Sequence, residues 1–255
     1  MILFAILFVL ATAASFYLLY SKSSEPALPV VVFEKVGIPP KNTHLKHEWT
    51  SPLALKKQIL WLKKHGFNFL NFHQLQQDEK LPSKPILLVF MGGYKNFLTE
   101  VFPLLEELKL PATLCLVPNL IGTYNAWQNP AKEPWQNLLT QHDLKTIYKS
   151  GHISFAAAPL TNENYADFSD EDICFALQEA LFRLKTQYGF PPSACTFWPY
   201  CHSKASLDIA LRQGNLPFIS AIRGTNPVTC DNRYFKTLYF SRFPIKTKLT
   251  LWKLR

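Results

Sequence analysis

Apolar and polar residues follow two different periods along this chain, and the two periods take turns. Continuous apolar runs rich in β-branched residues predict buried strands, and amphipathic segments of about ten residues predict helices. The expected strands are 29–33, 67–72, 86–90, 112–117, 153–157, 194–200 and 218–222. The expected helices are 51–66, 99–108, 141–152, 169–184 and 205–213. Strands that alternate with helices favour a parallel sheet with crossover helices, and seven such units suit an incomplete (β/α)7 barrel.

Two of the predicted helices carry clear start signals. Ser51 is a natural N-cap, Pro52 suits the first helical position, and Gly66 suits the end of the helix. Ser169, with Asp172 three residues later, has the pattern of a capping box. These signals fix the expected helix boundaries independently of the apolar period.

The first twenty-one residues differ from the rest of the chain. Residues 2–20 contain no charge, and at about 1.5 Å per residue they nearly match a hydrocarbon core of about 30 Å. We favour a membrane anchor over 1–21 that faces the extracytoplasmic side, with a short tether at 22–28 and one domain at 29–255. A signal peptide cut near Ala11-Thr12-Ala13, giving a secreted or periplasmic protein, and a buried helix of a soluble protein are the alternatives.

Charge and cysteine content narrow the partners. All 27 basic and 18 acidic residues follow the apolar segment, so the net charge of +9 belongs to the remainder of the chain. That charge favours anionic surroundings such as lipid headgroups or wall polymers, or simply aids solubility. No basic stripe with regular aromatic interleaving suggests nucleic acid. The five cysteines show no Cys-x-x-Cys spacing, and Cys115, inside an apolar run, is interpreted as a core residue.

The strand at 86–90 runs into Met91-Gly92-Gly93 and then into a helix. A turn after the carboxyl end of such a strand is where α/β folds usually place catalytic groups. A thioether and two glycines, however, can neither bind a hard cation nor move a proton. The expected position of an active site therefore lacks the chemistry of one.

Several segments, in order, carry a resemblance to a known family. They are "LPVVVFEKVGIPPKN", "SPLALKKQILWLKKHGFNFLNFHQL", "PILLVFMGGYKNFLTEVFPLLEELKLPATLCLVPNLIG", "NAWQ", "SGHISFAAAPLTNENYADFSDEDI" and "FWPYC". Together they resemble the polysaccharide deacetylase family, whose members have a distorted (β/α) barrel. The resemblance covers nearly everything after the first segment. It implies metal-assisted hydrolysis of an acetyl group on a glycan, with a divalent metal such as zinc held by one Asp and two His.

At the positions that match the family's motifs, this chain carries other residues. Where the family reads Thr-Phe-Asp-Asp-Gly-Tyr, Met91 stands at the base and Gly92 at the metal Asp. Ala158 and Asn162 stand at the two metal His positions. We therefore expect no metal, no cofactor and no catalytic residue of the family type.

What remains is binding. If the fold holds, one set of side chains is expected around the mouth of the barrel: Glu34, Tyr94, Asn125, Trp127, Asn162, Trp198, Tyr200 and His202. Aromatic faces stack on sugar rings, and polar tips add hydrogen bonds. The alternative is that these residues have only structural roles: the aromatic residues cap the core, Glu34 pairs with a nearby base such as Lys35 or Arg223, and His202 is solvated. Trp49, Trp61, Trp135 and Trp252 are interpreted as packing residues.

The sequence thus predicts an exported or membrane-anchored pseudoenzyme that binds a cell-envelope polysaccharide or an envelope protein complex. One alternative is an active carbohydrate deacetylase with rebuilt ligands, for which the candidates are Glu34, Asn162, Cys201 and His202. The other is a protein-interaction scaffold without glycan affinity.

Overall fold

The protein was analysed as a computed structural model that describes residues 27–77, 81–161, 168–196, 216–223, 226–227 and 234–239. The chain divides into two units, residues 1–26 with 243–255 and residues 27–242, and all described residues belong to the second. The predicted helix at 205–213 and the predicted anchor lie outside the described residues.

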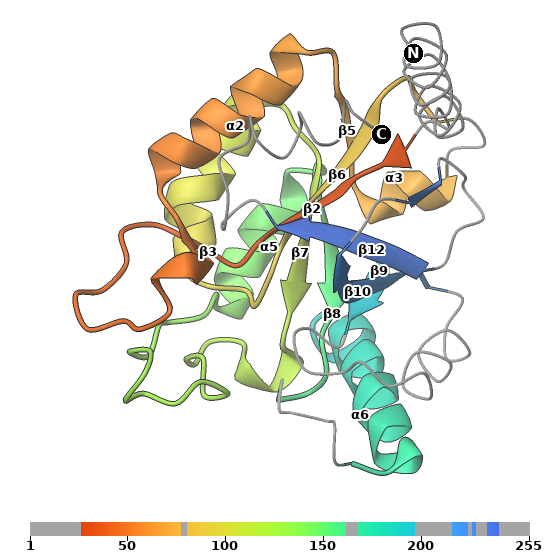
Figure 1. The fold of residues 1–255 in the computed structure, drawn as a ribbon. Coiled ribbons are helices and arrows are strands. Elements are labelled where there is room, and N and C mark those ends of the chain that lie inside the picture. Colours follow the sequence, from red (N-terminus) through yellow and green to blue (C-terminus); the bar gives the residue numbers. More distant parts are fainter. Residues whose placement is uncertain are drawn as a thin grey trace, which may run out of the picture. The chain divides into compact units, whose positions relative to one another are not determined.

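The core of the fold is one parallel sheet of eight strands (Figure 1). In spatial order the strands are β2 (Val30–Phe33), β12 (Tyr234–Tyr239), β10 (Phe218–Arg223), β9 (Ala194–Thr196), β8 (Ile153–Ala157), β7 (Ala112–Leu116), β6 (Pro85–Phe90) and β5 (Asn68–Leu70). Strand β2 also pairs with β6, from Val30–Leu87 to Phe33–Phe90, so the sheet curls back on itself. This parallel, curled α/β sheet confirms the predicted class of fold.

Helices follow the strands. They are α2 (Pro52–Lys64), α3 (Phe72–Gln77), α4 (Phe102–Leu108), α5 (Gln141–Lys149) and α6 (Asp170–Phe182), with π-helical segments η2 (Phe97–Val101) and η5 (Arg183–Gln187) and 3₁₀ turns η1 (Lys46–Glu48) and η3 (Pro118–Leu120). The predicted caps are present: Ser51 Oγ accepts from Ala54 N at 3.2 Å, and Ser169 Oγ accepts from Asp172 N at 3.1 Å.

Two small sheets flank the barrel strands. Strand β1 (Ala27–Leu28) pairs antiparallel with β11 (Asn226–Pro227), and β3 (Lys35–Val36) pairs parallel with β4 (Trp49–Thr50). The β3–β4 pair is too short to be seen as an alternating pattern in the sequence. It holds the residues just after β2 beside those just before α2.

The predicted strand at 67–72 ends earlier than its apolar residues suggest. Asn71 turns the chain: its Oδ1 accepts from Gln74 N at 2.9 Å, as a helix cap does. The backbone N–H of Phe72 donates to Thr113 Oγ1 at 3.1 Å, and Phe72 opens α3 with its side chain fully buried. The apolar run therefore covers a strand and the start of a helix.

The interior is filled from the sheet. One buried cluster joins Val30, Val32, Leu87 and Val89 to Met91, Cys115, Ala156, Ala194 and Ile219 from the other strands. Cys115 is fully buried, as predicted for a core residue. Each fully buried Val, Leu, Ile or Met side chain of this cluster contributes about 1.5–3 kcal/mol. Within the described part of the chain, no helix combines the length and apolar character needed to cross a bilayer.

Candidate functional site

The turn after β6 is tied to the neighbouring strand and built from glycine. Met91 N donates to Phe33 O at 2.9 Å, which extends the β2–β6 pairing by one bond. The Met91 side chain is 6% exposed and packs into the buried cluster. Gly92 and Gly93 then adopt φ values of +84° and +67°, which L side chains rarely adopt. The backbone itself thus selects glycine at both positions.

The space beside Gly92 is filled by aromatic rings. A Cβ atom added at Gly92 would lie 2.7 Å from Tyr94 Cε2, 3.2 Å from Tyr94 Cδ2 and 3.4 Å from Trp127 Cζ2. Tyr94 is 5% exposed, and its ring meets that of Trp127 edge to face, with centroids 5.9 Å apart. A side chain at position 92 would therefore collide with a fixed ring.

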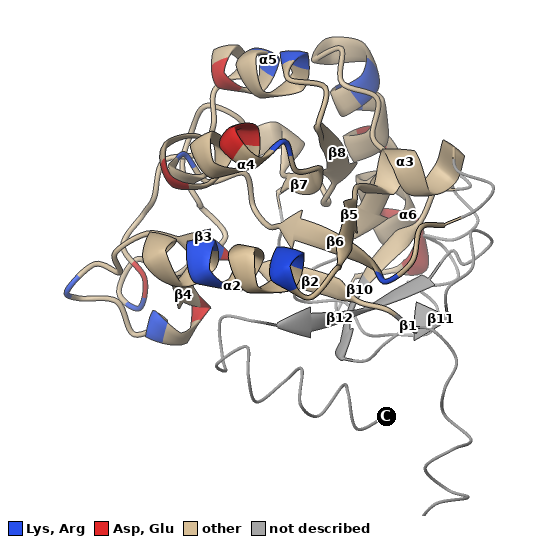
Figure 2. Ribbon diagram, turned by 90° about the horizontal axis from the view of Figure 1, so that it is seen from above, with Lys and Arg blue, Asp and Glu red and all other residues tan. Residues whose placement is uncertain are grey.

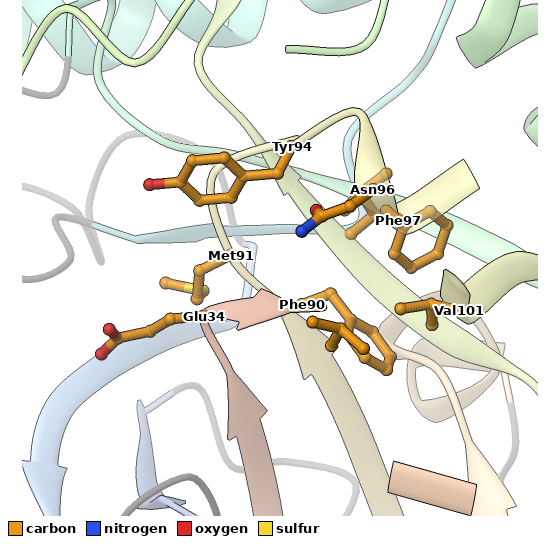
Figure 3. A pocket seen from close by; sticks show the side chains of 9 residues that line it. Glu34, Phe90, Met91, Tyr94, Asn96, Phe97 and Val101 are labelled. Carbon is orange, nitrogen blue, oxygen red and sulfur yellow. The ribbon is translucent and has the colours of Figure 1, made fainter. Parts of the chain in front are cut away.

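A shallow hollow of about 190 Å³ lies next to this turn (Figure 3). It is lined by Glu34, Val36, Phe90, Met91, Tyr94, Asn96, Phe97, Val101 and Leu114. The carboxylate of Glu34 and the hydroxyl of Tyr94 point to one side, and Phe90, Phe97 and Val101 gather on the other (Figure 3). Glu34 is the one carboxylate among the residues that line it.

A buried ion cluster lies next to Tyr94. We call it the Lys35 cluster; it is formed by Lys35, Thr43, Glu48, Trp49 and Glu133. Lys35 Nζ is 2.7 Å from Glu48 Oε2 and 3.1 Å from Glu133 Oε1, and the side chains of Lys35 and Glu133 have no exposed surface. Trp49 Nε1 donates to Glu133 Oε1 at 3.1 Å, and Thr43 Oγ1 donates to Glu133 Oε2. Every charge in the cluster thus has a partner, which burial demands.

The Lys35 ammonium also faces two aromatic rings. Its Nζ lies 5.5 Å from the centroid of Tyr94 and 5.8 Å from that of Trp49, within the range of cation–π attraction. The buried ammonium of Lys35 therefore helps to hold the Tyr94 ring, which fills the space beside Gly92. The two ion pairs of Lys35 run to Glu48 and Glu133.

Asn125 is a structural residue of the adjacent loop. It has no exposed surface; its Oδ1 accepts from Gln136 N, and its Nδ2 donates to Gln128 Oε1, each at 2.5 Å. Gln128 Nε2 in turn donates to Glu48 Oε2 at 3.2 Å, which joins this loop to the Lys35 cluster. The amide of Asn125 is thus occupied within the protein, and burial separates it from any sugar at the rim.

A second ion pair fixes the other side of the turn. Lys95 Nζ is 2.6 Å from Asp143 Oδ2, which also accepts from Thr140 N and Oγ1 as part of a capping box on α5. Burial raises the pKa of Asp143, but the hydrogen bonds from Lys95 and Thr140 outweigh it and lower that pKa below its ordinary value. Leu139 N also donates to Gly93 O at 2.8 Å. The glycine turn is therefore held firmly in its conformation.

These residues do not fit the metal that the family resemblance implies. Position 92 has no room for a carboxylate, and Met91 offers only a buried thioether. Ala158 is 4% exposed and has only a methyl side chain, and its backbone N–H donates to Leu116 O. Among the described residues, no three His, Cys, Asp or Glu side chains gather closely enough to hold a metal ion. Asn162 lies outside the described residues.

The other predicted site residues divide into three groups. Glu34 lines the hollow, while Tyr94 and Asn125 are buried and Trp127 is half-buried, so Tyr94 does not present the open ring face that was expected. Trp198, Tyr200 and His202 lie outside the described residues, and their roles stay predictions. The packing role predicted for Trp135 is wrong, because 52% of this residue is exposed. Sequence reasoning also missed Glu133 and Tyr124, whose types alone do not signal burial or exposure.

The fold and the motifs identify the class of protein. A model of the polysaccharide deacetylase family matches residues 78–217, more than half of the chain. The chain therefore belongs to the polysaccharide deacetylase family.

Named relatives share the family over shorter stretches. The chain is 32% identical over 74 residues to the poly-β-1,6-N-acetyl-D-glucosamine N-deacetylase of Escherichia coli K12, covering 28% of this chain and 11% of that protein. It is 31% identical over 110 residues to the Staphylococcus epidermidis enzyme of the same name, covering 42% of this chain and 36% of that protein. The chain thus spans about a tenth and about a third of these two relatives.

Solved structures support the same fold. A Streptococcus pyogenes deacetylase in complex with acetate is similar with a TM-score of 0.74 at 15% identity, covering 89% of this chain and 98% of the other. A polysaccharide deacetylase from Bacillus cereus is similar with a TM-score of 0.74 at 16% identity, covering 91% and 70% of the two chains. At these sequence identities the similarity shows that the fold is shared, and nothing beyond the fold.

Proposed function

We propose that this chain is a non-catalytic member of its family that binds a cell-envelope glycan outside the cytoplasm, held at the membrane by residues 1–21. The observation that carries the proposal is the contact between Gly92 and Tyr94. The family's metal aspartate would stand at position 92, where a positive φ and a ring 2.7 Å from the nearest side-chain position leave no place for it. The site is filled rather than merely missing one ligand.

The glycan part of the proposal rests on family membership and on the rim. The relatives named above are deacetylases of poly-β-1,6-N-acetyl-D-glucosamine, so an oligomer of that sugar is a suitable first ligand. Glu34 and the half-buried Trp127 border the turn, and Trp198 and Tyr200 are predicted from the sequence to join them. Retention of the barrel without its reaction centre favours a surface that still holds a carbohydrate.

The first experiment measures metal and acetate on the same sample. The full chain, purified in a mild detergent without chelators, is offered zinc, cobalt, nickel and manganese, and bound metal is measured by elemental analysis. Acetate release from a β-1,6-linked N-acetylglucosamine hexamer is measured in parallel. We expect metal far below one ion per chain and no acetate above the buffer control.

Three outcomes are distinct. One tightly held ion per chain together with acetate release would overturn the proposal and establish an active deacetylase with rebuilt ligands. No metal but measurable glycan binding, weakened when Trp198 and Tyr200 are both replaced by Ala, would support it. No metal and no binding of any glycan would leave a protein-interaction scaffold and would refute the glycan part.

A further inference from the structure

An exposed pair of stacked aromatic rings stands on the loop that follows β7. The ring centroids of Tyr124 and Trp135 are 4.3 Å apart, with 27° between the ring planes. Tyr124 is 39% and Trp135 is 52% exposed, so each ring covers one face of the other and leaves further apolar surface in water. Most large aromatic side chains avoid such exposure, and exposed aromatic residues are enriched where proteins bind ligands.

Both aromatic residues lie close in the sequence to buried residues that hold the loop in place. Tyr124 directly precedes the fully buried Asn125, and a backbone bridge joins it to Asn137. Trp135 lies two residues after Glu133, which is fixed from three sides within the Lys35 cluster. Both rings are therefore held by the loop backbone before any ligand arrives, which lowers the entropy that binding must overcome.

Exposed basic residues lie on the loop that carries this pair and on the loop beside it. The loop between β3 and β4 carries Lys41, His44, Lys46 and His47, all exposed, and the neighbouring loop adds the exposed Lys132. His44 N donates to Lys132 O at 2.8 Å, so the two loops lie side by side, as the orange and green loops do in Figure 1. Basic positions, drawn in blue, follow the loop before β4 in Figure 2.

The acidic residues of the same two loops do not balance these cations at the surface. Glu133 is fully buried and Glu48 largely so, and both direct their carboxylates to Lys35. The outward charge of this region is therefore positive. A flat aromatic platform beside exposed cations matches a sugar ring that carries an acidic group: its C–H face stacks on the ring, and its anion attracts the cations.

We infer that the Tyr124–Trp135 pair, with Lys132 and the β3–β4 loop, binds an acidic pyranose polysaccharide. This inference rests on the proposed glycan-binding function and narrows its ligand class. Anionic lipid is the competing partner for an aromatic and basic surface. The structure favours the sugar, because the rings are already stacked on one another and pinned among polar residues such as Gln136 and Asn137 instead of projecting for insertion.

The test compares two hexamers on the full chain in zwitterionic detergent micelles. Hexagalacturonate is the acidic probe, and the β-1,6-linked N-acetylglucosamine hexamer is the neutral one; binding is followed by calorimetry and tryptophan fluorescence. We expect tighter binding of the acidic hexamer, weakened about threefold to tenfold by Trp135→Ala and by Tyr124→Ala. Lys132→Ala should reduce the salt dependence of binding. Phe175→Ala, which removes a 64% exposed aromatic residue from α6, is the matched control and should change nothing.

Each other outcome has a definite meaning. Equal or tighter binding of the neutral hexamer would overturn the acidic class while leaving glycan binding intact. Unchanged affinity in both aromatic variants would overturn the platform alone. Absence of binding to either hexamer would overturn the acidic class and, together with no binding of any other glycan, would refute the glycan part of the proposed function as well. A Trp135-dependent fluorescence change caused by phosphatidylglycerol in the micelles, and by neither hexamer, would assign the surface to the membrane instead.

Discussion

The ring of Tyr94 occupies the space in which a side chain on Gly92 would begin, 2.7 Å from the ideal Cβ position. The ring is itself held in place by Trp127 and by the ammonium of Lys35. This arrangement explains why the turn after β6 is compatible with a folded barrel and incompatible with the carboxylate that the family usually has there.

Gly92→Asp is therefore expected to destabilise the protein and not to create a metal site. The unfavourable φ alone costs about 1–3 kcal/mol, and the collision with Tyr94 adds to it. Denaturant unfolding measures the loss. Tyr94→Ala combined with Gly92→Asp should lose less than the sum of the two single variants, since it removes the collision. A Gly92→Asp variant as stable as the wild type would contradict the geometry.

Removing one partner from the Lys35 cluster should be costly. Lys35→Ala leaves Glu133 buried without its cation, and breaking such a pair typically costs about 3–5 kcal/mol. Lys56→Ala is the control, because Lys56 and Glu107 form an exposed pair at 3.9 Å that should contribute less than about 1 kcal/mol. Similar losses in the two variants would show that the cluster is not a stabilising centre.

Asp143 makes the stability depend on pH in the acid range. Its pKa is lowered in the folded protein, so its contribution is fully present above the unfolded value of about 3.9 and is lost as the pH falls through the folded pKa. Asp143→Asn should therefore be less stable than wild type at pH 6, and the gap should shrink below about pH 4. Unfolding curves measured between about pH 2.5 and about pH 7 would reveal this shrinking gap. A gap in stability that does not change with pH would exclude this role for Asp143.

Cys115 and Cys195 should resist alkylation in the folded protein. Burial raises the pKa of both thiols, that of Cys195 to about 12, and for Cys115 the neighbouring Cys195 adds to the rise. Thiolates are the reactive form, so iodoacetamide at pH 8 should reach the half-buried Cys174 before either of them. Peptide mapping by mass spectrometry gives the order, and denatured protein gives the fully labelled reference. Rapid labelling of Cys115 in the native state would contradict its burial.

The sequence predicted the barrel because strands such as β6, β7 and β8 are buried on both faces and appear as apolar runs. The strand β12 was missed: "YFKTLY" mixes polar and apolar residues, and no helix pattern follows it. Its place between β10 and β2 depends on closing the sheet, which no local pattern encodes. The early end of the strand at 67–72 was missed because Phe72 is equally apolar in a strand and in a helix.

The site was predicted less completely, for a related reason. Met91 and Gly92 were recognised from the turn itself, but the ring that fills the space beside Gly92 belongs to a contact that only the folded turn reveals. Lys35 and Glu133 lie far apart in the sequence, and either would ordinarily be assigned to the surface. A lysine two residues after the buried strand β2 was the one available signal. Trp135 shows the opposite error, because residue type alone cannot distinguish packing from exposure.

The burial of Glu133 also has a kinetic consequence for the loops around the mouth. The segment that carries it and the loop before β4 share one set of charges, so separating them would expose Lys35 and Glu133 to water together. Local opening of either loop should therefore require opening of both, as one cooperative unit. The amide protons of His44 and Asn125, donated to Lys132 O and Gln136 O, should then exchange with solvent at closely matched rates.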